Sequence, residues 1–133
     1  MSIHVQRDAG RAGLRHTVRI RDHAIVVDEL AAVGGDDAGP SPHELYDAAL
    51  GACKALTVLW YAKRKNMPLA DVEVVVDRDD SAERQGLYKL KASLRLSGDL
   101  SDAQRDELLK VAGKCPVHWL MTEVKTEIET VWL

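Results

Sequence analysis

Two cysteines, Cys53 and Cys115, are the residues of this sequence best suited to covalent chemistry. Two cysteines in 133 residues are too few for the disulfide scaffold of a small secreted protein. In a reducing compartment a cysteine serves as a buried packing group, a metal ligand or a nucleophile. The local sequence around each cysteine therefore has to decide among these three roles.

Cys115 precedes a proline, and proline favours the first position of a helix. We therefore expect Cys115 at the N-cap of a short helix over residues 116–121. Free N–H groups and the helix dipole stabilise a thiolate there, and Lys114 adds a neighbouring positive charge. The prediction is a cysteine of lowered pKa, and the alternative is an ordinary thiol at a helix boundary.

Cys53 lies within an apolar stretch, and its helical neighbours at spacings of three and four residues are mainly apolar. Taken alone, this pattern favours core packing, where desolvation raises the pKa of a thiol. A nucleophilic Cys53 would need a cation brought to it from elsewhere in the fold.

Along the chain, segments with the hydrophobic periodicity of strands alternate with segments that have the periodicity of a helix, and these elements position the two cysteines. Residues 2–30 predict three short strands in a meander, and the Gly- and Pro-rich residues 34–42 predict a loop. Ser41 and Pro42 then suit the start of a helix that ends near residues 63–66. Between residues 48 and 62 Lys54 is the only charged residue, so we expect a helix buried on most sides, either centrally or at a dimer seam.

The second half of the chain predicts two further strands, over residues 72–77 and 87–96. Ser101 and Gln104 form the capping box of an amphipathic helix that ends at Gly113, and residues 124–132 alternate as a closing strand. The prediction is a single α+β domain over residues 1–133, with antiparallel sheets and a long central buried helix.

Composition excludes several functional classes. The net charge of −3 provides no positive field for nucleic acid. No apolar run approaches the length of a membrane span, and no targeting signal is visible, so we expect a cytoplasmic protein without membrane association.

Two motifs resemble those of the family of osmotically induced protein C and the organic hydroperoxide resistance proteins (OsmC/Ohr). The first is Gly-Pro-Ser-Pro-His-Glu-Leu at residues 39–45, followed by Ala-Ala-Leu-Gly-Ala-Cys at 48–53. The second is Lys-Cys-Pro-Val-His at residues 114–118. Both the order and the separation of the motifs resemble the family pattern, and they place this chain with its OsmC-like branch.

The resemblance implies a thiol peroxidase that acts in oxidative stress defence. By position, Cys53 is the peroxidatic thiol that attacks an organic hydroperoxide, and Cys115 is the resolving thiol that forms a disulfide with it. A dithiol, such as the lipoyl group of a lipoylated protein, then reduces the disulfide. The family fold is an intertwined homodimer with its sites at the interface, and it implies no bound cofactor or metal.

The sequence departs from the hydroperoxide branch at its expected glutamate, where His43 stands and Glu44 follows one position later. We therefore include His43 and Glu44 among the candidate catalytic residues. The family also implies an arginine that activates the first cysteine. We favour Arg15 among the N-terminal arginines, with Arg11 next.

Two other readings remain open. Cys53, Cys115, His43 and His118 could form a Cys2His2 zinc site, although their spacing is not that of a zinc finger. The second alternative is a binding or thiol-carrier module that keeps the fold but has little peroxidase activity, and His43 in place of glutamate motivates it.

Overall fold

The computed structural model describes residues 1–10 and 12–133, and these form two compact units, 1–46 and 47–133. Our expectation of a single domain over the whole chain stays a prediction.

The 1–46 unit contains a three-stranded antiparallel meander, as the alternation predicts. Its strands are β1 (Ile3–Arg7), β2 (His16–Ile20) and β3 (His23–Val27), and β2 is the central strand. Val18 of β2 lies opposite Val5 on one side and Ile25 on the other. β-Branched residues fit such pleated, half-buried positions, which explains why this segment forms strands.

The loop after β3 is organised by one buried carboxylate. Asp28 accepts backbone N–H groups from Glu29, Asp36 and Ala38, at 2.8, 3.2 and 3.1 Å. These hydrogen bonds, that from Glu29 foremost, lower the pKa of the Asp28 carboxyl. The short helix η1 (Ala31–Val33) lies within this loop. Asp28 thereby fixes the backbone that leads to the first long helix.

That helix, α1 (Pro42–Arg64), begins in the first unit and continues through the second. The 47–133 unit then contains β4 (Leu69–Asp79), the short helix η2 (Glu83–Gln85) and β5 (Lys89–Gly98). It ends with α2 (Asp102–Ala112) and α3 (Pro116–Thr122). The capping box of Ser101 and Gln104 is confirmed, and so is the short helix after Cys115.

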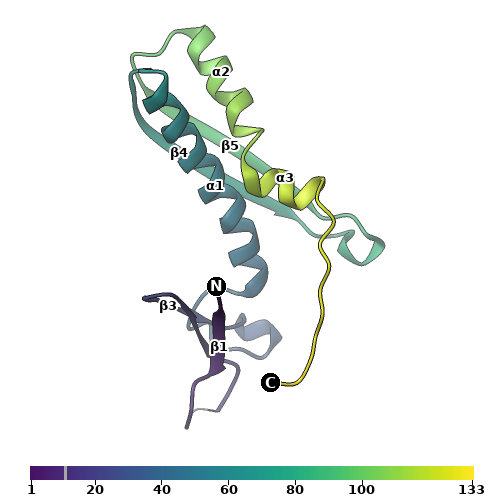
Figure 1. Ribbon diagram of the computed structural model, residues 1–133. Coiled ribbons are helices and arrows are strands. Elements are labelled where there is room, and N and C mark those ends of the chain that lie inside the picture. The colour runs from purple at the N-terminus through teal and green to yellow at the C-terminus, as the bar shows by residue number, and fades with distance from the viewer. Residues whose placement is uncertain (11) are drawn as a thin grey trace. The chain divides into compact units, whose positions relative to one another are not determined.

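The core of the second unit lies between its two longer helices and one face of the β4–β5 hairpin (Figure 1). Val58 and Ala62 of α1 pack with Leu108 and Ala112 of α2 in the buried cluster. Alternate strand residues close this cluster from the sheet side, namely Leu69, Val72, Leu94 and Leu96. The architecture is the expected α+β class with antiparallel sheets.

One face of α1 is buried within the second unit. The opposite face exposes large apolar side chains, with Leu56 68% and Trp60 59% exposed. The sequence of α1 is apolar almost all round. The β4–β5 hairpin and α2 pack against one of its faces.

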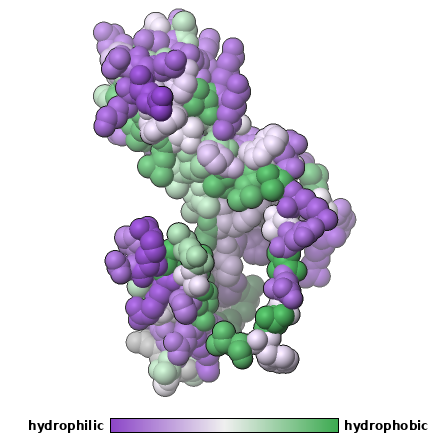
Figure 2. All heavy atoms as spheres, in the orientation of Figure 1, coloured by the Kyte–Doolittle hydropathy of each residue, from purple (hydrophilic) through white to green (hydrophobic). Residues whose placement is uncertain are grey.

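The predicted strand over residues 124–132 is wrong for the isolated chain. Residues 124–133 form neither helix nor strand, and Ile128 and Trp132 are 85% and 100% exposed. Figure 2 shows hydrophobic atoms open to solvent along this segment. Alternating polar and apolar residues are compatible with a strand, but a strand also needs the edge of another strand with which its backbone can pair. Within the described part of the chain, the sheets contain β1–β2–β3 and β4–β5 alone.

Among the described residues, no helix has the length and apolar character required to cross a membrane.

Candidate active site

Cys53 lies in the middle of α1, on the side that meets the start of α3. Its side chain is partly exposed, and its Sγ accepts the backbone N–H of Val117 at 3.4 Å. The first N–H groups of a helix have no partner within the helix, so one of them is available to this sulfur. The positive end of α3 is therefore directed at Cys53 as well as at Cys115.

Cys115 is the N-cap residue of α3, as predicted, and its side chain is completely buried. Cys53 and Cys115 both carry free thiols, and the two side chains are close enough for Cys53 to affect the ionisation of Cys115. The structure thus brings together the two cysteines that the sequence motifs single out.

The expectation of an acidic Cys115 is wrong. Burial raises the pKa of the Cys115 thiol, and the neighbouring Cys53 side chain raises it further. The backbone N–H of His118 and the charge of Lys54 act in the opposite direction. The helix N-terminus does favour the thiolate, but complete desolvation of the sulfur outweighs it.

Lys54 is a buried cation that sequence reasoning did not assign to the site. It is only 5% exposed, and its Nζ donates to the Ala112 carbonyl oxygen at 2.9 Å and approaches His118 Nδ1 at 3.0 Å. The carbonyl belongs to the last residue of α2, where the helix dipole is negative. A lone lysine within an apolar helix was the available signal, because such a residue is buried only when it has partners.

His118 follows Cys115 by three residues and lies in the first turn of α3. Its ring nitrogen Nδ1 contacts the Lys54 ammonium. A lysine ammonium has no lone pair, so Nδ1 must accept this hydrogen bond and the ring must carry its proton on Nε2. No group of three or more His, Cys, Asp or Glu side chains suited to a metal ion occurs among residues 1–10 and 12–133.

Glu44 has a structural partner in the first turn of α1. Its carboxylate accepts the backbone N–H of Ser41 at 2.8 Å, and its own N–H donates to Ser41 Oγ at 3.3 Å. These two bonds form a capping box of the same type as that at the start of α2. His43 lies in the same turn, in the 1–46 unit.

Arg15 belongs to the 1–46 unit and directly precedes β2. Its Nε lies 2.7 Å from Asp8 Oδ2, and Thr17 donates to the other oxygen of the same carboxylate. The arginine favoured from the sequence is thus already ion-paired within its own unit. The second choice, Arg11, lies outside the described residues.

A second polar cluster, centred on the buried Asp47, links α1 to the hairpin. Asp47 accepts Arg78 Nε at 2.7 Å on one carboxylate oxygen and the Tyr88 hydroxyl at 2.7 Å on the other. Desolvation and the bond to Asp47 raise the pKa of Tyr88 to about 12, so its hydroxyl stays a donor. This cluster fixes the rotation of α1 and thereby the direction of Cys53 and Lys54.

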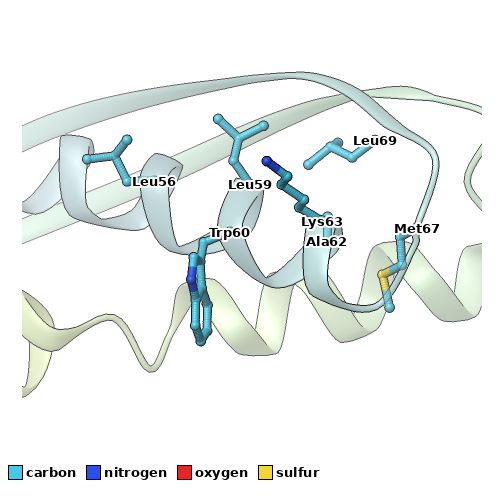
Figure 3. A pocket seen from close by; sticks show the side chains of 7 residues that line it. All are labelled: Leu56, Leu59, Trp60, Ala62, Lys63, Met67 and Leu69. Carbon is cyan, nitrogen blue, oxygen red and sulfur yellow. The ribbon is translucent and has the colours of Figure 1, made fainter.

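Two cavities adjoin α1 in the second unit. The smaller, of about 200 Å³, is walled by Lys54 and His118 and by apolar side chains of α1, the hairpin and α2. The larger, of about 540 Å³, is an open groove over the second half of α1 and the turn that follows it (Figure 3). Leu56, Trp60 and Met67 are among the side chains that line this groove, and neither cysteine does. The larger groove is therefore an exposed apolar surface next to the cysteine site.

The comparisons with known proteins agree on the fold. A family model described as "OsmC-like protein" matches residues 34–130. A Psychrobacter arcticus protein named for osmotic stress induction and detoxification has a TM-score of 0.77 at 16% identity, over 92% of this chain and 89% of that chain. A search among curated proteins finds no match.

Two further solved structures are named for resistance to organic hydroperoxides. The protein from Legionella pneumophila has a TM-score of 0.66 at 18% identity, over 92% of this chain and 90% of that chain. OhrB of Bacillus subtilis has a TM-score of 0.60 at 23% identity, and the alignment covers 92% of each chain.

Proposed function

Because the chain belongs to the OsmC-like protein family, we propose that it is a cysteine-based thiol peroxidase that reduces organic hydroperoxides to alcohols in oxidative stress defence. The observation that carries the proposal is the pairing of Cys53 with Cys115 at the start of α3. The names of the Legionella pneumophila and Bacillus subtilis structures support the choice of substrate class.

In the proposed cycle the Cys53 thiolate attacks the distal oxygen of the hydroperoxide. The O–O bond breaks, the alkoxide takes a proton and leaves as an alcohol, and Cys53 becomes a sulfenic acid. The Val117 N–H supports the anionic sulfur before attack. Cys115 then displaces the hydroxyl as water to form a disulfide, which a dithiol such as a lipoyl group reduces. The cytoplasm suits this cycle because it keeps both thiols reduced.

A positive charge near Cys53 completes the proposed site. We assign it to Arg15, from the same or a partner chain, with His43 and Glu44 as the polar residues beside it. To act in this way, Arg15 would have to share or give up its ion pair with Asp8. Glu44 would likewise have to share or give up its hydrogen bond in the capping box. No bound cofactor or metal takes part in the proposed chemistry.

We further propose that the chain acts as a homodimer. The exposed face of α1 and the extended residues 124–133 together present large apolar side chains to solvent. An apolar surface of this kind, unlike scattered single residues, is typical of a protein interface. A second copy could cover the α1 face and give residues 124–132 a strand edge to pair with.

The second candidate is a binding or thiol-carrier module without efficient peroxidase activity. It is favoured by His43 at the glutamate position and by the use of Glu44 as a helix cap. Stopped-flow oxidation of the reduced protein by cumene hydroperoxide and by hydrogen peroxide distinguishes the two. Fast oxidation that prefers the organic peroxide is the expected result. Slow oxidation by both peroxides would favour the carrier.

A further inference from the structure

Lys54 is an ammonium group buried without an acidic partner. Its two hydrogen-bond partners, the Ala112 carbonyl and the His118 ring, are both uncharged, since His118 accepts through Nδ1. No carboxylate of the described residues lies within ion-pair distance of Lys54. Burying a charge in this way costs free energy, and a nearby opposite charge would interact with it strongly.

The group that can supply this negative charge is Cys115. Cys115 lies between the two partners of Lys54 in the sequence, three residues after Ala112 and three before His118. The titratable side chains that face its thiol are Lys54 and Cys53 from α1, and His118 follows it on α3. Of these, Lys54 alone carries a positive charge.

We propose that Lys54 is the positioning residue for the resolving step, with its ammonium held by Ala112 and His118 so that a Cys115 thiolate can form in a buried site. This inference rests on the peroxidase function proposed above and adds a residue to it. His118 serves as the acceptor that keeps the ammonium directed at this end of α3.

The step that Lys54 assists is balanced without any further reactant. Cys115 loses its thiol proton, and its thiolate attacks the sulfur of the Cys53 sulfenic acid. The S–S bond forms as the S–O bond breaks, and the departing hydroxide takes up one proton to become water. The charge on Lys54 stabilises Cys115 only while that residue is a thiolate, so it lowers the barrier to attack.

Spectroscopic titration tests this inference directly, because the chain holds only two cysteines. In a Cys53→Ser background the ultraviolet absorbance of the thiolate reports the ionisation of Cys115, once the titration of a Cys53→Ser/Cys115→Ser double variant, which keeps the three tyrosines, has been subtracted. We expect Lys54→Met to raise the Cys115 pKa by about one unit or more, and Lys54→Arg to leave it close to the parent value. Lys63→Met on the exposed end of the same helix is the matched control and should change nothing.

Two results would overturn the inference. One is an unchanged titration of Cys115 in Lys54→Met, and the other is an equal shift in Lys54→Arg, which would mark a purely structural role. Lys54→Gln, which keeps a donor for the Ala112 carbonyl but no charge, gives the same readout if the methionine variant does not fold.

A kinetic measurement links the titration to the reaction. With both cysteines present, Lys54→Met should prolong the lifetime of the Cys53 sulfenic acid, once formed, by about tenfold relative to the parent. Disulfide formation at the parent rate would contradict the proposed role. If Cys53 is not oxidised in any variant, the peroxidase proposal fails, but the titration still reads the Lys54–Cys115 interaction by itself.

Discussion

At the start of α3 two thiols share the helix N-terminus but differ in their access to solvent. Cys53 is partly exposed and receives the Val117 N–H, whereas Cys115 is completely buried. Desolvation disfavours the thiolate of Cys115 more than that of a thiol in contact with water. This difference in burial supports the proposal that Cys53, and not Cys115, makes the first attack on a peroxide, which is also the assignment that the family resemblance implies.

The raised pKa of Cys115 predicts a pH dependence of disulfide formation. Below that pKa the thiolate fraction, and with it the rate of attack on the Cys53 sulfenic acid, increases about tenfold per pH unit. Single-turnover experiments with one equivalent of cumene hydroperoxide, quenched at intervals and assayed for free thiols, measure this rate. We expect it to rise from about pH 6 to about pH 9.

Cys115→Ser provides the control for that experiment and should form no intramolecular disulfide at any pH. A rate that does not change between neutral and alkaline pH would show that ionisation of Cys115 does not limit the step.

At the scale of elements, both long helices of the described chain begin with a capping box. Ser41 with Glu44 caps α1, and Ser101 with Gln104 caps α2. The capping role predicts that Glu44→Gln, which still accepts the Ser41 N–H, keeps its stability, whereas the proposed place of the Glu44 carboxylate beside Arg15 predicts a loss of peroxidase activity. Ser41→Ala should cost about 1 kcal/mol in the free energy of unfolding, measured by urea denaturation.

Ser101→Ala on the distant α2 cap is the matched control, with a similar loss of stability and unchanged activity. Should Glu44→Gln instead keep the parent activity, then Glu44 acts only in the cap and not beside Arg15.

Local patterns predicted the elements well because their causes are local. Ser101 and Gln104 set the start of α2 through bonds three residues apart, and Pro116 sets the start of α3. Ser41 and Glu44 have the same three-residue spacing, but the start of α1 was predicted from Ser41 and Pro42 without the contribution of Glu44.

Features that depend on distant residues were predicted poorly. The pKa of Cys115 follows from its burial, and the position of Lys54 follows from the Ala112 carbonyl and His118 far along the chain. No local pattern contains that information. The strand expected over residues 124–132 failed for the same reason, because a strand requires a partner that alternation does not specify.

At the scale of the whole molecule, the proposed homodimer predicts how substitutions on the exposed α1 face behave. Leu56→Glu and Trp60→Glu place charge in the proposed interface, where an unpaired carboxylate would lose its hydration. We expect the unmodified protein to sediment as a dimer and both variants to shift toward monomers. Sedimentation velocity over a range of protein concentrations measures this.

Lys91→Glu, on the exposed face of β5, is the control and should remain dimeric. If the unmodified protein sediments as a monomer at all concentrations, the homodimer proposal is wrong. Residues 124–133 would then need another partner.

The roles of the two cysteines are the central claim, and trapping of the sulfenic acid with dimedone tests them most directly. After one equivalent of cumene hydroperoxide, Cys115→Ser should accumulate a dimedone adduct on Cys53, located by peptide mass spectrometry. Cys53→Ser should consume no peroxide and form no adduct. The opposite pattern, with an adduct on Cys115 in Cys53→Ser and no reaction in Cys115→Ser, would contradict the assignment.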